Sequence, residues 1–243
     1  MYKDIKLLVS PKNIQEARVT INAGVDYIDC KNPKEGSLGA NFPWIIQEMK
    51  SIIPGDSKQV LSATIGDFPN LPGTASLAAL GAALSGADII KVGLKGPKTK
   101  EQGIFLMKNV IKAVKNYNNK IRTVTAGYAD YKRLNNALDF LSIPDIAAES
   151  GSDIAMLDTY IKDGKNLFYF LNIDQLLKFI KKANEYNLKT ALAGNLKKED
   201  FSKIKKLSPD IIGVRSAVCE GFDRNNGTIK YDSIIELRRE LNR

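Results

Sequence analysis

The sequence predicts an α/β protein built as a single closed (β/α)8 barrel, the TIM-barrel architecture. Short β-rich runs recur at spacings of about 20–35 residues, and helix-like segments separate them. This alternation favours right-handed crossovers and a parallel sheet. Eight such units in 243 residues match a closed barrel, whereas an open doubly wound sheet usually has about five or six strands. No linker or composition break divides the chain, so we expect one domain over residues 1–243.

The expected strands are rich in apolar and β-branched residues, and most end at Gly, Asp, Asn or Pro. They are Ile5–Ser10, Tyr27–Lys31, Val60–Gly66, Ile89–Leu94, Arg122–Tyr128, Ile154–Thr159, Lys189–Gly194 and Ile211–Ser216. No GxGxxG turn follows the first strand, which argues against a dinucleotide-binding domain.

The first helix is expected to open at Ser10-Pro11-Lys12, because Ser is a common cap and Pro suits the first helical position, and to end at Gly24. Two of the other segments, Lys100–Lys115 and Ile173–Tyr186, combine apolar residues at helical spacing with lysines on the opposite face. The remaining expected helices are Trp44–Ile52, the Ala-rich Thr74–Ser85, Pro144–Ser150, Asp200–Leu207 and Ser233–Leu241.

The chain contains no His, which excludes Ser-His-Asp and Cys-His catalysis and HExxH zinc sites. Acid–base work must therefore fall to Asp, Glu, Lys, Tyr or Cys. The two cysteines, Cys30 and Cys219, form neither a CxxC pair nor a four-thiolate site. Such sparse cysteine is typical of a reducing compartment.

The net charge of +9 has two interpretations, a nucleic-acid partner or a surface that favours anionic metabolites. The lysines are spread along the whole chain, and no RNP motif or zinc finger occurs, so we expect no nucleic-acid partner. No apolar run approaches the length of about 18 residues that a membrane span needs. The charged start, Met1–Lys6, leads into an apolar run too short for a signal peptide, so we expect a cytoplasmic protein without membrane contact.

Charged residues occur at strand ends where a buried strand should be apolar. Because side chains alternate faces with period two, Asp29 and Lys31 share one face of the second strand. Lys91 interrupts the fourth strand, while Asp158 and Arg215 end the sixth and eighth. Active sites of such barrels lie at these carboxyl ends.

These charges have a structural and a functional interpretation. Charges inside a barrel are costly unless they are paired or functional. As structural pairs, Asp29 would bind Lys31 and Asp158 would bind Lys91. The recurrence at four strand ends favours the alternative, a site for an anionic small molecule.

Lysines in a pocket without His indicate amine chemistry, in which a Lys attacks a carbonyl and forms a Schiff base. The ordinary Lys pKa near 10.4 must then fall by about three pH units, or about 4 kcal/mol. Burial and a neighbouring ammonium lower the pKa of a lysine, whereas a nearby carboxylate such as Asp29 raises it. The sequence alone does not decide this balance.

The loops after the seventh and eighth strands are candidate phosphate sites, because these loops commonly bind phosphate through backbone N–H groups. Gly194 and Asn195 follow one strand, and Arg215 and Ser216 follow the other. Simple tight turns are the alternative explanation. Lys162, Asp163 and Lys165 follow the sixth strand in a Gly-containing loop, and one of them is expected to reach the site.

The stretch Cys30–Pro43, CKNPKEGSLGANFP, resembles the signature of the (5-formylfuran-3-yl)methyl phosphate synthases, also called 4-(hydroxymethyl)-2-furancarboxaldehyde-phosphate synthases, of methanofuran biosynthesis. The resemblance runs nearly end to end. It includes Leu80–Ala83, Lys91–Leu94, Ala126–Asp130, Met156–Thr159, Ile161–Lys165 and Ala191–Gly194. Tyr160 and Asn195 stand where the family pattern leads us to expect smaller residues, and Asn135-Asn136 precedes a stretch that the pattern does not match. Asn195 could alter phosphate contacts.

The resemblance implies a TIM barrel that acts on glyceraldehyde 3-phosphate without a metal or cofactor. Two triose phosphates would condense to a furan aldehyde phosphate with loss of phosphate and water. By matching motifs, Lys31 resembles the Schiff-base lysine of the family and Lys91 its proton acceptor. Asp29, Asp158 and Lys162 resemble further active-site residues.

Two other interpretations stay open at this point. One is another class I aldolase acting on a phosphosugar, and the other is a non-catalytic basic binding protein. The Ala-rich Thr74–Ala87 segment could pack against the barrel or form a subunit interface, and a homo-oligomer is expected.

Overall fold

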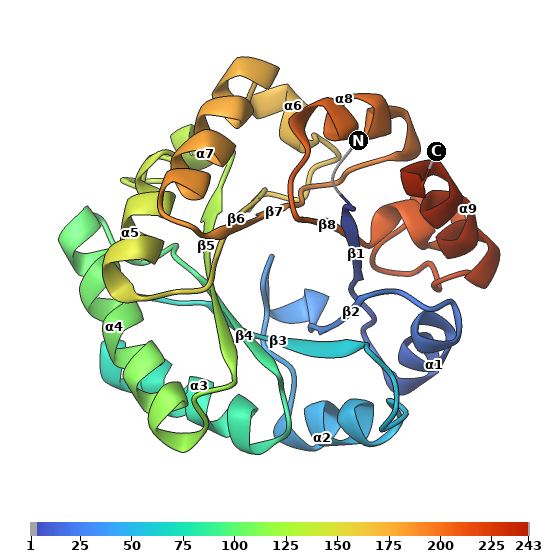
Figure 1. The fold of residues 1–243 in the computed structure, drawn as a ribbon, viewed down its shortest axis with the longest axis horizontal. Helices are drawn as coiled ribbons and strands as arrows, with labels where there is room; N and C mark the ends of the chain where they lie inside the picture. Colours follow the sequence, from blue (N-terminus) through green and yellow to red (C-terminus); the bar gives the residue numbers. More distant parts are fainter. Residues whose placement is uncertain (1–3, 243) are drawn as a thin grey trace.

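The expected strands form a closed parallel barrel in chain order in a computed structural model, which describes residues 4–242 (Figure 1). The ring closes where β8 pairs with β1, with Lys6 opposite Ile211. The strands are β1 (Lys6–Val9), β2 (Tyr27–Cys30), β3 (Val60–Asp67), β4 (Ile89–Gly93), β5 (Arg122–Tyr128), β6 (Ile154–Asp158), β7 (Lys189–Leu192) and β8 (Ile211–Val214). The predicted (β/α)8 fold is confirmed.

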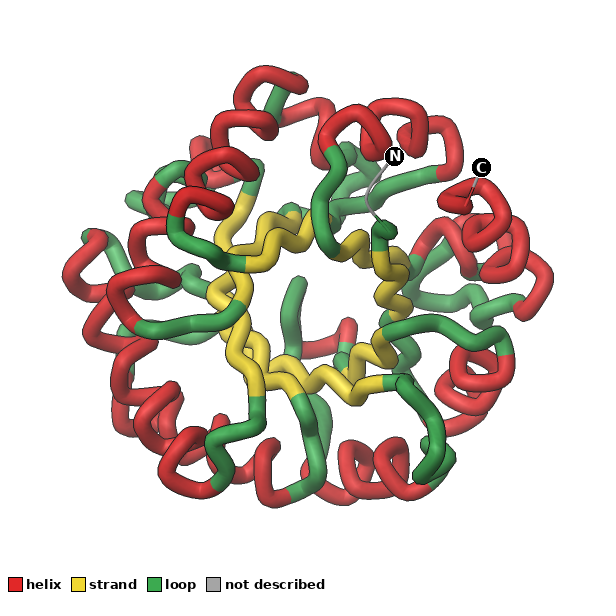
Figure 2. Tube along the Cα trace, viewed as in Figure 1, coloured by secondary structure: helices red, strands yellow, loops and turns green. Residues whose placement is uncertain are grey.

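Helices surround the ring of strands on its outside, as the view down the barrel shows (Figure 2). They are α1 (Ile14–Asn22), α2 (Pro43–Ser51), α3 (Pro72–Leu84), α4 (Lys100–Tyr117), α5 (Ser142–Ser150), α6 (Leu167–Phe170), α7 (Ile173–Glu185), α8 (Phe201–Leu207) and α9 (Tyr231–Asn242). The single-turn α6 has no counterpart in the sequence prediction, because four residues are too few to show a helical repeat.

The first helix starts later than predicted. It begins at Ile14, and the Asn13 side chain accepts a hydrogen bond of 2.9 Å from the N–H of Glu16 as its N-cap. Ser10 is therefore not the cap, and its hydroxyl instead donates to Asp29 at 2.8 Å. Both residue types can cap a helix, so the sequence did not decide between them.

Each strand presents one face to the helices and the other to the barrel interior. Ile28 and Cys30 of β2 belong to the larger core between strands and helices. Asp29 and Lys31 lie on the inner face, as the alternation predicts. Large side chains from several strands fill the interior below them, namely Leu8, Tyr27, Ile89, Val124, Ile154, Met156 and Ile211. The barrel is therefore packed below its mouth and is not a channel.

The loop after β2 folds over part of the barrel mouth, and we call residues 33–39 the plug loop. Leu38 is fully buried among the side chains of the interior. Its N–H donates to Asp67 at 3.2 Å, and the Ser37 hydroxyl donates to the carbonyl of Thr159, beyond β6, at 2.8 Å. The plug loop thus spans from β2 to β6, and Figure 2 shows this segment inside the ring of strands.

The outer surface bears on two further expectations. Within residues 4–242, no helix is long and apolar enough to cross a membrane. The Ala-rich α3 packs on the barrel through Ala75 and Ala79, and it leaves Leu77 and Leu84 exposed. A subunit interface at this helix stays a prediction.

Candidate active site

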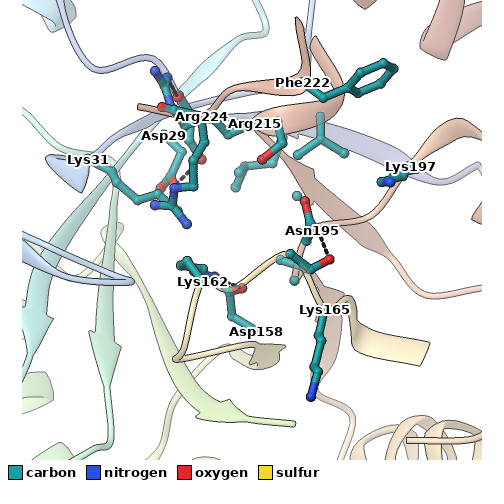
Figure 3. Close-up of a pocket in the computed structure, with 18 of the residues that line it drawn as sticks. Asp29, Lys31, Asp158, Lys162, Lys165, Asn195, Lys197, Arg215, Phe222 and Arg224 are labelled. Carbon is teal, nitrogen blue, oxygen red and sulfur yellow. Dashed lines mark hydrogen bonds and ion pairs between the residues drawn. The ribbon is translucent and has the colours of Figure 1, made fainter. Parts of the chain in front are cut away.

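A pocket opens at the carboxyl ends of the strands, on the side of the mouth that the plug loop leaves free (Figure 3). Residues from β1, β2, β4, β6 and β8 and from the loops after β1, β2, β6, β7 and β8 contribute to it. The lining includes Ser10, Asp29, Lys31, Lys91, Asp158, Lys162, Gly194, Asn195, Arg215, Ser216 and Arg224. Every residue predicted for the site therefore lines this one pocket.

Lys31 directly follows β2, and its backbone position aims the side chain into the pocket (Figure 3). The residue is only 6% exposed. Burial lowers the pKa of this amine to about 7, against the opposing charges of Asp158 and Asp29. The Lys31 amine therefore loses its proton at a much lower pH than an exposed lysine does, because burial outweighs the two carboxylates.

Lys91, Asp29 and Ser10 form a buried chain of contacts beside Lys31. The Lys91 ammonium lies 2.8 Å from one oxygen of Asp29, and the Ser10 hydroxyl donates to the other oxygen at 2.8 Å. Burial alone would raise the pKa of Asp29, but the charges of Lys91 and Lys31 outweigh it and hold the pKa below its ordinary value. Asp29 is therefore an anion held by an ion pair on one oxygen and by a hydrogen bond on the other.

A second acid–amine pair faces the same pocket from β6. The Lys162 ammonium donates to Asp158 at 2.7 Å and to the Thr159 hydroxyl at 3.2 Å. Burial would raise the pKa of Asp158, but the charges of Lys162 and Lys31 bring it down to about 2. Burial also lowers the pKa of Lys162, against the opposing charge of Asp158.

The pairing of these charges corrects the structural interpretation of the sequence. Asp29 pairs with Lys91 rather than with Lys31, and Asp158 pairs with Lys162 rather than with Lys91. Lys31 is left between the two pairs without a carboxylate in ion-pair contact among the described residues. Within residues 4–242, no carboxylate at ion-pair distance therefore opposes the loss of a proton from Lys31.

The predicted phosphate site after β7 has a constrained backbone. Gly194 has a φ of 111°, and a Cβ there would lie 3.0 Å from the Thr159 methyl group. Asn195 also adopts a positive φ, of 50°, and its side chain donates to the carbonyl of Gly164 at 2.7 Å. The Asn195 amide therefore ties two loops together at the pocket rim.

Arg215 lines the pocket, but its guanidinium is directed into the protein. It forms a buried ion pair with Glu16 at 2.8 Å and donates to the carbonyls of Ser10 and Arg224 at 2.6 and 2.7 Å. Ser216 starts a short 3-10 turn at the same rim. A direct phosphate contact by Arg215 would have to compete with these bonds.

Comparison with known proteins decides the family. A family model described as 4-HFC-P synthase matches residues 7–238, almost the whole chain. The chain belongs to this family. It is 53% identical over 232 residues to the (5-formylfuran-3-yl)methyl phosphate synthase of Methanocaldococcus jannaschii, covering 96% of this chain and 97% of that protein. The enzymes of the same name from Methanobrevibacter smithii and Methanosarcina barkeri are 49% and 51% identical over 96% and 97% of this chain, and 97% and 99% of their own lengths.

Solved structures of lower identity agree with the fold of this synthase-family chain. The crystal structure of KGPDC from Streptococcus mutans gives a TM-score of 0.66 at 15% identity, covering 99% of this chain and 98% of that one. A 3-hexulose-6-phosphate synthase gives 0.67 at 16% identity, with 97% and 99% covered. At these identities the likeness concerns the barrel alone.

Sequence reasoning missed several residues that line the pocket of this family member, and Ser10 and Arg224 are the two that the site chemistry uses. Ser10 was assigned to a helix cap, although it directly follows a strand, as Lys31 does. Arg224 lies in an irregular loop after β8, where no strand or helix repeat marks the inward positions. A search for polar residues after every strand would have found Ser10, but no sequence pattern pointed to Arg224.

Tyr128 and Asp67 support the plug loop from below. The buried Tyr128 hydroxyl donates to one oxygen of Asp67, whose other oxygen accepts from the N–H of Leu38. Burial and the charge of Asp67 raise the pKa of Tyr128 well above its ordinary value. Tyr128 therefore stays protonated as a donor, and its role is to hold the plug loop next to Lys31.

Proposed function

We propose that this protein condenses two molecules of glyceraldehyde 3-phosphate to 4-(hydroxymethyl)-2-furancarboxaldehyde phosphate, through a Schiff base on Lys31, in methanofuran biosynthesis. The observation that carries the proposal is the Lys31 amine, buried at the barrel mouth with a pKa of about 7. The family membership of the chain supports the choice of product. No metal or cofactor is invoked in this reaction.

The neutral Lys31 amine adds to the carbonyl of one triose phosphate, and loss of water gives an iminium ion. This cation withdraws electrons from the neighbouring carbon, so that a proton can leave and an enamine forms. The enamine carbon then attacks the aldehyde of the second triose phosphate and makes the new C–C bond. Ring closure and elimination release one phosphate and two water molecules in net balance, and the Lys31 amine is freed.

The two acid–amine pairs move the protons of these steps. Lys91 gives its proton to the oxygen that leaves as water when the imine forms, takes up in its place the proton that leaves the carbon beside the imine, and Asp29 holds the resulting ammonium at 2.8 Å. Lys162, held by Asp158 at 2.7 Å, protonates the leaving oxygens during dehydration. Proton transfer by positioned groups of this kind typically contributes about 10²–10⁴-fold to the rate.

Incubation of the purified protein with glyceraldehyde 3-phosphate tests the proposal. We expect a furan aldehyde that absorbs in the near ultraviolet, with the mass of two triose phosphates less one phosphate and two waters. Borohydride added during turnover should leave a stable adduct on Lys31, located by mass spectrometry of peptides. Lys31→Ala should abolish both results, while Lys34→Ala, at an exposed lysine in the plug loop, should retain both.

Other outcomes would point to the competing functions. A Lys31 adduct without any furan product, together with aldol or cleavage products, would indicate another class I aldolase. No adduct and no turnover, with a salt-sensitive shift of DNA or RNA, would indicate a basic binding protein. An adduct formed at normal yield in Lys31→Ala would place the nucleophile elsewhere.

A further inference from the structure

We propose that Arg224, in the loop after β8, binds a phosphate group of the substrate. The inference rests on the proposed function for the identity of the ligand, a phosphorylated aldehyde. It concerns a residue that the strand-end pattern of the sequence did not mark.

Arg224 extends into the pocket from its loop, and Figure 3 shows its guanidinium directed toward Lys31. The residue is half-buried. Burial lowers the pKa of Arg224, with the charge of Asp158 opposing, yet an arginine keeps its charge in proteins. Within residues 4–242 its guanidinium has no hydrogen-bond or ion-pair partner. A half-buried cation with open donors, aimed into a cavity, is suited to an anion.

The other cations of the pocket are already engaged. Lys91 and Lys162 contact Asp29 and Asp158, as described above. Arg215 contacts Glu16.

The remaining lysines of the lining are poorly placed for a ligand held at Lys31. The Lys165 ammonium lies 4.4 Å from the centre of the Tyr169 ring, and Figure 3 shows it pointing away from the pocket. Lys197 is exposed at the opposite rim. Arg224 is therefore the best-placed cation for a phosphate on a substrate that is bound to Lys31.

The loop that carries Arg224 is built to hold one conformation. An antiparallel bridge between Cys219 and Ile229 closes its base. Asp223 accepts from the N–H groups of Asn225 and Asn226 at 2.8 and 3.0 Å and shapes the turn.

Contacts from outside the loop fix the Arg224 backbone itself. The Arg215 guanidinium donates to the Arg224 carbonyl at 2.7 Å, while Glu16 holds Arg215 from the other side. Lys12 donates to the carbonyl of Asn225 at 2.8 Å. Arg215 and Lys12 thus position the loop, and the Arg224 side chain faces the ligand.

The chemistry of the guanidinium suits this role. Its planar fork matches two oxygens of a phosphate group, and such charge-assisted bonds are about twice as strong as neutral ones. A phosphate brought next to the buried carboxylate of Asp158 also needs a cation to offset the repulsion. Arg224 supplies that charge without the loss of a protein ion pair.

Three variants and three ligands test the proposal. The variants are Arg224→Gln, Arg224→Lys and, as a matched control for charge removal, Arg18→Gln on the exposed face of α1. Binding of inorganic phosphate is measured by calorimetry, and kcat and KM are measured with glyceraldehyde 3-phosphate. Borohydride trapping of unphosphorylated glyceraldehyde on Lys31 reports the amine without a phosphate contact.

Arg224→Gln should weaken phosphate binding and raise KM by about 10- to 100-fold, the range of a hydrogen bond to a charged group. Trapping of glyceraldehyde should stay within about twofold of the wild type. Arg224→Lys should recover part of the phosphate affinity, and Arg18→Gln should behave as the wild type in every assay.

Unchanged phosphate binding in Arg224→Gln would overturn the proposal, and so would an equal loss of glyceraldehyde trapping, which would indicate a structural role. The phosphate titration needs no turnover, so it is independent of the proposed reaction. If the wild type makes no furan product while Arg224→Gln still loses phosphate affinity, the proposed function fails and the role of Arg224 stands.

Discussion

Replacement of Lys31 by Met should stabilise the protein at neutral pH, by an amount that shrinks as the pH rises. Lys31 is buried, and its pKa falls from 10.5 to about 7 on folding. The unfolded chain therefore binds more protons than the folded chain between these two values, and the stability of the wild type rises with pH in this window. This lowering of the Lys31 pKa reduces the free energy of unfolding of the wild type by about 4 kcal/mol at pH 7 and by about 2 kcal/mol at pH 9.

Lys31→Met keeps the length of the side chain and removes the titration. We expect its free energy of unfolding to exceed that of the wild type by up to about 4 kcal/mol at pH 7 and by about 2 kcal/mol at pH 9. Urea denaturation of both proteins at several pH values measures the difference, in which the titration of every other lysine cancels. An excess that does not change between pH 7 and pH 9 would refute the reasoning, because Lys31 would then bind the same number of protons in the folded and unfolded chains over that range.

Three further predictions concern the surroundings of Lys31. Asp158→Asn removes a charge that raises the pKa of Lys31. In the activity that this variant retains, the rising part of the plot of kcat/KM against pH should move to lower pH. A shift to higher pH would contradict this. Tyr128→Phe removes the donor to Asp67 and should cost about 2 kcal/mol in urea unfolding, whereas unchanged stability would show that the plug loop does not depend on it. Glu16→Gln breaks the buried pair with Arg215 and should cost roughly 3 kcal/mol, and a melting temperature equal to that of the wild type would argue against a structural role for the pair.

The sequence by itself determined the barrel and the face on which each strand residue lies. Parallel strands in one barrel must expose their carboxyl ends at one rim, and period-two alternation must place Asp29 and Lys31 on the same side. The presence of Lys91, Asp158 and Lys162 in a single pocket was predictable for the same reason.

Only the tertiary structure decided which charges pair. Alternation gives the face of a side chain but not its partner, because a long lysine inside a closed barrel can reach several strands. Lys91 on β4 forms an ion pair with Asp29 on β2, and Asp158 forms one with Lys162, four residues later in the chain. Lys31 is left buried and able to lose its proton. Arg224 depends on the folding of an irregular loop, where the chain has no periodicity from which an inward position could be read.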